Sequence, residues 1–259
     1  MGLYRTEAIV AGGMDLGEAD RIITFLTRRR GMIRAVASGA RRLRNRLGGK
    51  LQLFTHGALV YFAREGSDLA RINEFEPLHM FPSLRSDLDR LSYGSYLLEL
   101  SSQLLWQGEV AEDAFSLLLR SLLRLEKGVE AFHVEKGFES RLLGIAGYAP
   151  DLERCLKCKR LVGDDSLVRL LPEEGGIVCP DCSDHLSQGT VLSATSRSYL
   201  RQARSDDMER LQAVNLSPSE RKEISQALRS YLDRILQKRL RTLLFRDQLQ
   251  SSPPPPGEG

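Results

Sequence analysis

The chain has 259 residues and a formal net charge of +3, with 42% hydrophobic and 27% charged residues. This is the composition of an ordinary globular protein, and it excludes collagen-like and wholly disordered chains. No run of about 18 apolar residues occurs, which excludes a predicted membrane-spanning helix, and the length suits one large domain or two to three small ones.

The charge is distributed unevenly along the chain. Residues 1–80 carry 13 basic and 8 acidic side chains, whereas the remaining residues carry 24 and 26. Between Arg21 and Lys50 there are ten basic residues and no acidic one. Such segregation predicts a polyanionic partner for the N-terminal part of the chain.

Residues 1–80 are predicted to form a small β domain. The β-compatible runs are Leu3–Val10, Arg21–Thr27, Met32–Ala37, Leu53–Ala63 and Leu69–Glu76. We expect Gly12, Gly13 and Gly17 to break the chain after the first run, and Arg28–Gly31 to form a hairpin turn. Five short strands fit an OB-type barrel, and on periodicity alone an SH3-like barrel fits equally well.

The aromatic residues of this domain are assigned by strand alternation. Phe54, Val60 and Phe62 share one face of the fourth run, and we expect that face to be the core. Tyr61 lies on the opposite face and is a candidate for stacking on a base. Tyr4 and Phe25 are predicted to be packing residues.

From residue 81 onward the apolar period becomes helical. Leucine-rich runs predict helices at Leu84–Gln107, Val110–Lys127 and Val129–Ile145, and helix resumes near Ser196–Ala203. Ser217-Pro218-Ser219-Glu220 combines an N-cap, a proline at the first helical position and a glutamate at the third, so it predicts the start of a last helix that runs to about Leu249.

These patterns predict an α+β chain. The β-barrel domain occupies residues 1–80, and an α-helical bundle is formed in two parts by residues 81–150 and 191–249. Residues 151–190 interrupt the bundle as an insertion. Residues 250–259, with four consecutive prolines, are predicted to be a disordered tail.

All four cysteines of the chain lie in the insertion. They are Cys155, Cys158, Cys179 and Cys182, which form two C-x2-C pairs separated by 20 residues. Because each pair can present two sulfurs to one ion, the spacing predicts one structural Zn²⁺ per chain, without an open position for catalysis. A redox pair, or His185 in place of one cysteine, is the alternative. The first residues lack the apolar block of a signal peptide, which predicts the cytosol, where thiols stay reduced.

The acid-free segment is predicted to contact nucleic acid, because the planar guanidinium of arginine suits phosphate. The candidate contacts are Arg21, Arg28, Arg29, Arg30, Arg34, Arg41, Arg42, Arg44, Arg46 and Lys50. A solvated loop, another polyanion or an acidic protein partner is the alternative. Nothing in the sequence has the pattern of a helix that reads bases, so binding independent of sequence is favoured.

Motifs of catalysis and of ATP use are missing. Gly48-Gly49-Lys50 is followed by Leu51 and does not complete a phosphate-binding Walker loop, and neither H-E-x-x-H nor G-x-S-x-G occurs. We therefore expect a protein that is not an enzyme. A nuclease that uses Asp15, Glu18 and Asp20 to bind a metal is a weaker alternative.

Several segments, in this order and spacing, resemble those of a known family. They are Gly17–Ile22 with Leu26-Thr27 and Gly31, then Val36–Arg42 with Arg46-Leu47 and Leu51–Phe54, then Gly147–Pro150, and then Gly175-Gly176 before Cys179 and Cys182. Over about residues 1–245 the chain resembles the RecO family of bacterial recombination mediators. It has Ser38 where that family often has lysine, and Asn45 where the family often has serine.

The resemblance implies an N-terminal OB fold, a helical body and a zinc-binding insertion. It implies a non-enzymatic protein of the bacterial cytoplasm and nucleoid that binds single- and double-stranded DNA and anneals complementary strands. With RecR, such a protein helps to load RecA onto strands coated by single-stranded-DNA-binding protein, whose acidic tail would bind the helical body, and RecF is a further functional link. The family's basic loop falls on Arg41, Arg42, Arg44 and Arg46, and its zinc ligands fall on the four cysteines. A zinc-containing OB-fold factor that binds RNA is the alternative function.

Overall fold

The computed structural model describes residues 2–42, 47, 49–64, 66–105, 112–183 and 188–251. The chain divides into two compact units, residues 1–128 and 129–259. The division falls between Gly128 and Val129, inside the stretch 81–150 that is predicted to begin the helical domain.

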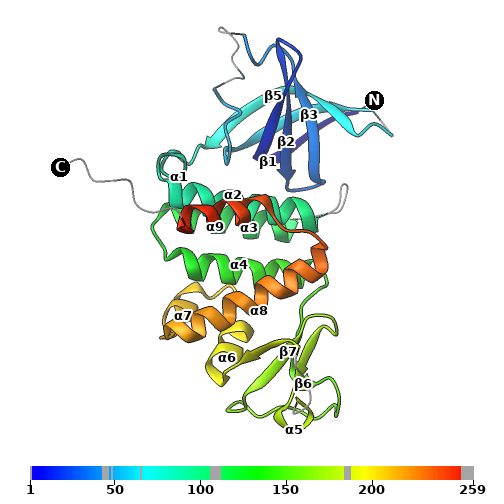
Figure 1. Ribbon diagram of the computed structural model, residues 1–259. Helices are drawn as coiled ribbons and strands as arrows, with labels where there is room; N and C mark the ends of the chain where they lie inside the picture. The colour runs from blue at the N-terminus through cyan, green and yellow to red at the C-terminus, as the bar shows by residue number, and fades with distance from the viewer. Residues whose placement is uncertain are drawn as a thin grey trace, which may run out of the picture. The chain divides into compact units, whose positions relative to one another are not determined.

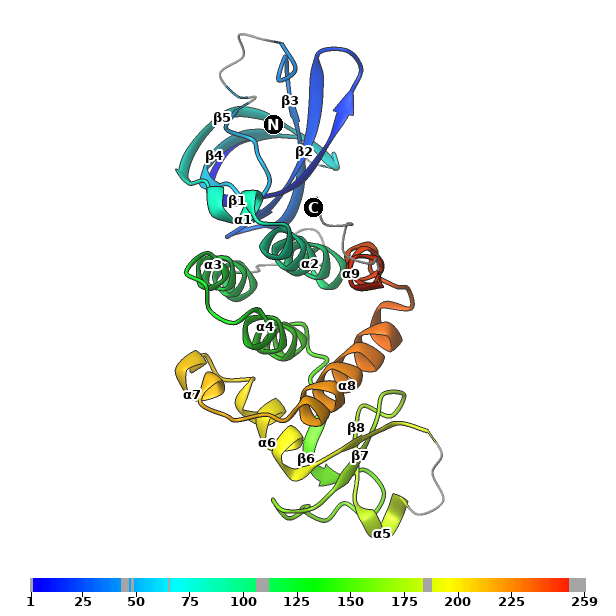
Figure 2. The same cartoon turned by 60° about the vertical axis from the view of Figure 1, so that its left-hand side comes forward.

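The first unit begins with a closed five-stranded barrel. Its strands are β1 (Gly2–Leu16), β2 (Asp20–Thr27), β3 (Gly31–Ala37), β4 (His56–Ala63) and β5 (Leu69–His79). They follow one another around the barrel in the order β1-β2-β3-β5-β4, with β1 paired to both β2 and β4 (Figures 1 and 2). The pairing of β3 with β5 is parallel and the other pairings are antiparallel. The predicted five-stranded OB-type barrel is confirmed.

Strand β1 is longer than the sequence pattern predicts. It continues through Gly12 and Gly13, which we expected to break it, and ends at Leu16. The register with β2 shifts between Val10 and Gly12, so the chain accommodates an irregularity there and keeps its pairing. The turn comes instead at Gly17, whose φ of 62° is accessible to glycine without strain.

The barrel interior corrects the prediction for the fourth run. Tyr61 is 2% exposed and belongs to the barrel core with Phe25, whereas Phe62 faces outward and is 41% exposed. Phe54 and Val60 are buried, at 0% and 7% exposure, so the expected buried face is wrong at Phe62. The barrel core itself takes Leu59 and Tyr61 from β4 and includes neither Phe54 nor Val60. Phe54 precedes β4 with a φ of 71° and is not part of the strand.

Three helices complete the described part of the first unit. They are α1 (Pro82–Ser86), α2 (Leu88–Leu104) and α3 (Glu112–Glu126). The predicted run Leu84–Gln107 is divided at Asp87, because the Asp87 side chain accepts a hydrogen bond from the Arg90 backbone N–H and caps α2. Gln107 and Val110, the expected ends of two helices, lie outside the described residues.

An arginine joins the barrel to α3. The Arg28 guanidinium lies 3.0 Å from Glu7 and 3.2 Å from Glu112, and its carbon lies 4.8 Å from the ring centre of Phe115. These ion pairs raise the pKa of Arg28 against the opposing effect of burial. Because Glu7 lies in β1 and Glu112 in α3, the ion pairs of Arg28 connect these two elements and stabilise the fold.

The second unit is a helical body. Its helices are α4 (Ala131–Ile145), α6 (Ala194–Gln202), α7 (Met208–Gln212), α8 (Pro218–Leu236) and α9 (Arg241–Ser251). The predicted capping box of Ser217 and Glu220 is present at the start of α8. The predicted continuous helix to Leu249 is wrong, because Gln237 takes a left-handed conformation with a φ of 53° and ends α8. No described helix is both long and apolar enough to cross a membrane.

The insertion forms a small sheet in the second unit. It contains β6 (Asp151–Cys155), β7 (Val168–Leu171), β8 (Gly176–Val178) and β9 (Thr190–Leu192), in the order β6-β8-β7-β9, and the short helix α5 (Pro180–Ser183). Arg197 of α6 is 1% exposed and donates hydrogen bonds to the carbonyls of Leu152, Val162 and Gly163. A buried guanidinium that is satisfied by three carbonyls fastens the insertion to α6.

The close approach of β4 to β5 predicts that alanine is poorly tolerated at Gly57. A Cβ at Gly57 would lie 2.5 Å from the Glu76 carbonyl oxygen and 2.7 Å from the Phe75 ring. We expect Gly57→Ala to lower the free energy of unfolding by about 1–3 kcal/mol, seen as a lower thermal midpoint by circular dichroism. The control is Gly12→Ala, because nothing lies within 4 Å of a Cβ at Gly12. Equal midpoints for the two variants would contradict the packing described.

Candidate nucleic-acid interface and metal centre

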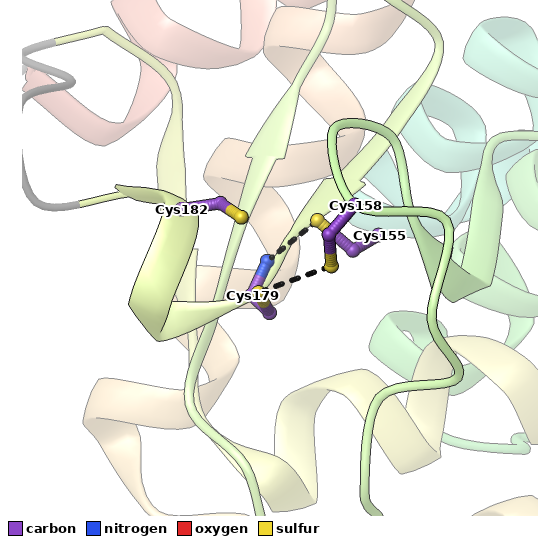
Figure 3. A group of neighbouring side chains, drawn as sticks. All are labelled: Cys155, Cys158, Cys179 and Cys182. Atoms are coloured by element: carbon purple, nitrogen blue, oxygen red, sulfur yellow. Dashed lines mark hydrogen bonds between the residues drawn. The ribbon is translucent and has the colours of Figure 1, made fainter.

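The four cysteines converge at one end of the small sheet. Cys155 ends β6, Cys158 lies in the turn that follows, Cys179 follows β8, and Cys182 lies in α5. All four Sγ atoms lie within 4.8 Å of one another, and those of Cys158 and Cys179 are 3.9 Å apart (Figure 3). The structure therefore brings together the two pairs that the spacing predicts.

Local backbone geometry forms the first cysteine turn. The Lys159 N–H donates to the Cys155 carbonyl at 2.9 Å, and the Cys155 N–H donates to the Arg160 carbonyl at 3.0 Å. Lys159 adopts a left-handed conformation with a φ of 63°, which reverses the chain directly after Cys158. The Cys179 N–H donates to the Cys155 Sγ at 3.4 Å and links the second cysteine turn to the first (Figure 3).

The cluster fits a tetrahedral metal ion. Metal–sulfur bonds of about 2.3 Å place the sulfurs of a regular tetrahedron about 3.8 Å apart, close to the distance between Cys158 and Cys179. The Arg160 side chain lowers the pKa of Cys158 to about 6, whereas hydrogen bonding with Cys179 and burial raise the pKa of Cys182 to about 12. Four adjacent thiols do not all ionise without a neighbouring cation, and a bound divalent ion supplies that charge.

The sequence offers two alternatives to a site of four cysteines: His185 as a ligand, and a carboxylate site in the barrel. Among the described residues, the four cysteines are the one group of three or more Cys, His, Asp or Glu side chains close enough to share an ion. His185, the alternative ligand, lies outside the described residues. Asp15 lies 3.4 Å from Arg21 and 3.5 Å from Arg41, so its carboxylate is engaged by guanidinium groups.

Eight of the ten predicted DNA contacts lie among the described residues, and they occupy several places on the first unit. Arg44 and Arg46 lie outside the described residues. Arg28 is committed to Glu7 and Glu112, as described above. Arg21 pairs with Asp15, and Lys50 lies 2.8 Å from Glu76.

The remaining five are exposed. Arg41 donates to the Gly17 carbonyl at 2.8 Å, which ties the start of the basic loop to the β1–β2 turn. The other four exposed residues are Arg29, Arg30, Arg34 and Arg42. The eight described basic residues of the acid-free segment therefore do not form one row.

Exposed arginines line two adjoining cavities on the barrel. The first, of about 550 Å³, is lined by Arg30, Arg34 and Arg64, and the second, of about 660 Å³, is lined by Arg64 and Arg71. Both are lined by Ala63, Arg64, Ser67 and Ala70. We call the surface formed by Arg30, Arg34, Arg64 and Arg71 the arginine groove.

Strand register places an apolar row beside the arginine groove. Leu3 lies opposite Phe62, Phe62 opposite Arg71, and Arg71 opposite Val36 on consecutive strands. Leu3 is 57% exposed and Phe62 is 41% exposed. An exposed aromatic ring beside guanidinium groups combines the two elements by which proteins hold single-stranded nucleic acid, a stacking surface for bases and cations for phosphates.

Sequence reasoning missed Arg64 and Arg71. Both follow the acid-free segment, and acidic residues stand near them in the sequence, namely Glu65, Asp68 and Glu74. A signal was present at Arg71, because it lies between the buried residues Ala70 and Ile72 and must face outward by alternation. Its approach to Arg34 and Val36 depends on the pairing of β3 with β5, which alternation does not reveal.

Comparison with known proteins gives consistent family matches. Residues 1–81 match the family model described as Recombination protein O N terminal, and residues 85–244 match the one described as Recombination protein O C terminal. Together these two models cover the barrel and most of the remaining chain.

Curated relatives match over nearly the whole chain. The DNA repair protein RecO of Roseiflexus sp. (strain RS-1) is 36% identical over 248 residues, which cover 96% of this chain and 86% of the relative. The DNA repair protein RecO of Symbiobacterium thermophilum is 34% identical over 254 residues, which cover 97% of this chain and 100% of the relative. That of Pelotomaculum thermopropionicum is 32% identical, with 98% of this chain and 97% of the relative covered.

The cysteine geometry predicts one metal ion per chain. We expect elemental analysis of anaerobically purified protein to find it, and Cys158→Ser to lower the metal content while Ser183→Ala leaves it unchanged. Because the ion joins two turns of one sheet, a chelator should speed hydrogen exchange of residues 151–183 and leave the barrel unchanged. Metal-free protein with the same exchange protection would contradict the assignment.

Proposed function

Because the chain belongs to the RecO family, we propose that it acts in DNA repair and recombination by binding single- and double-stranded DNA and annealing complementary strands. The observation that carries this proposal is the arginine groove with exposed Phe62 on an OB-type barrel. OB barrels bind strands of about 4–16 nucleotides along such surfaces.

Annealing follows from the electrostatics of the groove. Two DNA strands repel each other through their phosphates, and bound guanidinium groups offset that repulsion and release counterions. Duplex formation is itself favourable, so no ATP is consumed. Arg41 and Arg42 are exposed at the start of the basic loop, and Arg44 and Arg46 follow them in the sequence.

We propose further that the protein is a recombination mediator. With RecR it helps to load RecA onto single strands coated by single-stranded-DNA-binding protein, whose acidic tail is held by the helical body. A functional link to RecF completes the set of partners. Family membership supports these roles, and the cytoplasm, at the nucleoid, is the proposed location.

The metal is proposed to be Zn²⁺ with a structural role. Four cysteine thiolates form a closed donor set of the kind that structural zinc sites use. The cluster joins the turn after β6 to α5, and Arg197 fastens the same insertion to α6. The ion would hold the insertion in shape, and the cysteine side chains would take no part in chemistry on DNA.

We propose that the protein is not an enzyme. Two of the three carboxylates considered for a nuclease are engaged elsewhere: Asp15 with two arginines, and Asp20 as acceptor of the Gly39 N–H at 2.7 Å. The chain also lacks a Walker loop for nucleotide hydrolysis. Both observations favour a binding protein whose effect comes from bringing strands together.

Charge reversal in the groove tests the proposal. We expect Arg64→Glu with Arg71→Glu to weaken binding of a single-stranded oligonucleotide and to slow ATP-independent annealing of labelled complementary strands. A plot of the logarithm of the binding constant against the logarithm of the salt concentration should become less steep by about 1.4, because two phosphate contacts are lost. The matched control is Lys127→Glu with Lys222→Glu, which makes the same charge change at exposed lysines elsewhere.

The two double variants can be compared only if both are folded as the unmodified protein is. Circular dichroism and metal content should be unchanged in both double variants, so that only the position of the charge differs. If the groove variant binds and anneals as the control does, the arginine groove is not the DNA interface. If the unmodified protein neither binds nor anneals DNA, the proposed function itself is wrong.

A further inference from the structure

We propose that the first cavity, which forms one part of the arginine groove, takes up one unstacked nucleobase of a single strand and thereby makes the protein prefer unpaired DNA. This inference rests on the proposed function and deepens it. The cavity, here called the base pocket, is lined by the inward-facing side chains of Tyr4, Ile33 and Tyr61 and by the exposed Arg30 and Arg64. It is therefore an opening of the barrel interior to the surface.

A layered contact of cationic and aromatic side chains forms one wall of the base pocket. The guanidinium carbon of Arg30 lies 3.7 Å from the ring centre of Tyr4. Tyr4 is the cross-strand partner of Tyr61, and their ring centres are 5.4 Å apart with planes inclined by 31°. Tyr61 is fixed in the core at 2% exposure, whereas Tyr4 is half-buried and Arg30 is exposed.

Because Tyr4 lies between the buried Tyr61 and the exposed Arg30, its ring can serve as a stacking surface. Its ring packs against the buried Tyr61 on the protein side, and one of its faces is covered by the exposed Arg30. A nucleobase offers the same kind of flat π surface that a guanidinium covers, and both aromatic rings and arginine planes stack on unpaired bases. A base can therefore take the position of Arg30 on Tyr4 or stack against Arg30 itself.

Size and lining also fit a nucleotide. The volume of about 550 Å³ lies within the usual 300–1,000 Å³ of small-molecule sites. Met32, Ile33 and Ala70 give the base pocket apolar walls, as a base face requires, and the carboxylate of Asp68 can accept hydrogen bonds from base N–H groups. Arg34 and Arg64 supply cations for the flanking phosphates.

Duplex DNA cannot use the base pocket without losing base pairing. Its phosphates can still contact the arginine groove, but each base is stacked and paired, and extracting one costs free energy. The base pocket therefore contributes to binding of single strands and not of duplexes. This separates two properties of the surface: phosphate binding by the arginine groove, and strand selection by the base pocket.

Comparing a normal oligonucleotide with an abasic one of equal length tests the proposal in the full-length protein. The two strands carry the same phosphates and differ in their bases. We expect the unmodified protein to bind the abasic strand about tenfold more weakly. Tyr4→Phe should keep that ratio because the ring remains, whereas Tyr4→Leu should remove most of it, leave only the part contributed by Phe62, and leave duplex affinity unchanged. Phe62→Leu removes the exposed ring outside the base pocket. This variant should keep most of the difference in affinity between the normal and the abasic strand.

Photocrosslinking gives a second readout without a variant. A strand that contains 5-iododeoxyuridine should crosslink to the peptide that contains Tyr4, and excess duplex should compete poorly. Equal affinity for normal and abasic strands, or crosslinks that avoid Tyr4 and Arg30, would overturn the base pocket while leaving DNA binding by the groove intact. Absence of any DNA binding would instead refute the proposed function.

Discussion

The barrel depends on the parallel pairing of β3 with β5. Three residue pairs, Arg34 with Leu69, Ala35 with Ala70 and Val36 with Arg71, close a sheet that would otherwise have two open edges. The inward members, Ala35 and Ala70, are small and buried, which lets the two strands approach. The outward members bring Arg34 and Arg71 from separate parts of the sequence to one surface, so the same pairing that closes the core also assembles the arginine groove.

The basic residues of the barrel therefore divide into two groups. Arg28 and Arg21 are matched by carboxylates and stabilise the unit, since a half-buried guanidinium needs a partner. Exposed members such as Arg30 and Arg34 lack such ion pairs among the interactions described, so their charge is available to a ligand. A segment that is acid-free in sequence is thus neutralised in part by acids from β1 and α3, and net charge alone overstates its capacity for phosphate.

Sequence patterns predicted the features that depend on local spacing. The cysteine pairs and the capping box of α8 are confirmed because each needs only a few neighbouring residues. One error came where a single backbone angle decides the outcome: Gln237 takes a left-handed conformation and ends α8 although it is not a glycine. Tyr61 and Phe62 were assigned to the wrong faces because alternation separates the two faces of a strand but does not say which face lines the barrel. Arg71 was missed because its neighbours come from a pairing of distant strands, which no local period encodes.

If the proposed base pocket and groove act together, the protein would bind the reactants of annealing more tightly than its product. The arginine groove would attract phosphates of single strands and of duplexes alike, and so concentrate both complementary strands on the protein. When the strands pair, a base held near Tyr4 would have to leave the base pocket to join its partner, and the duplex would keep only phosphate contacts. The duplex would then bind more weakly than the two separate strands, because the stacking contribution is lost while the charge contacts remain. Release of the duplex would therefore follow from the same geometry that captures the single strand.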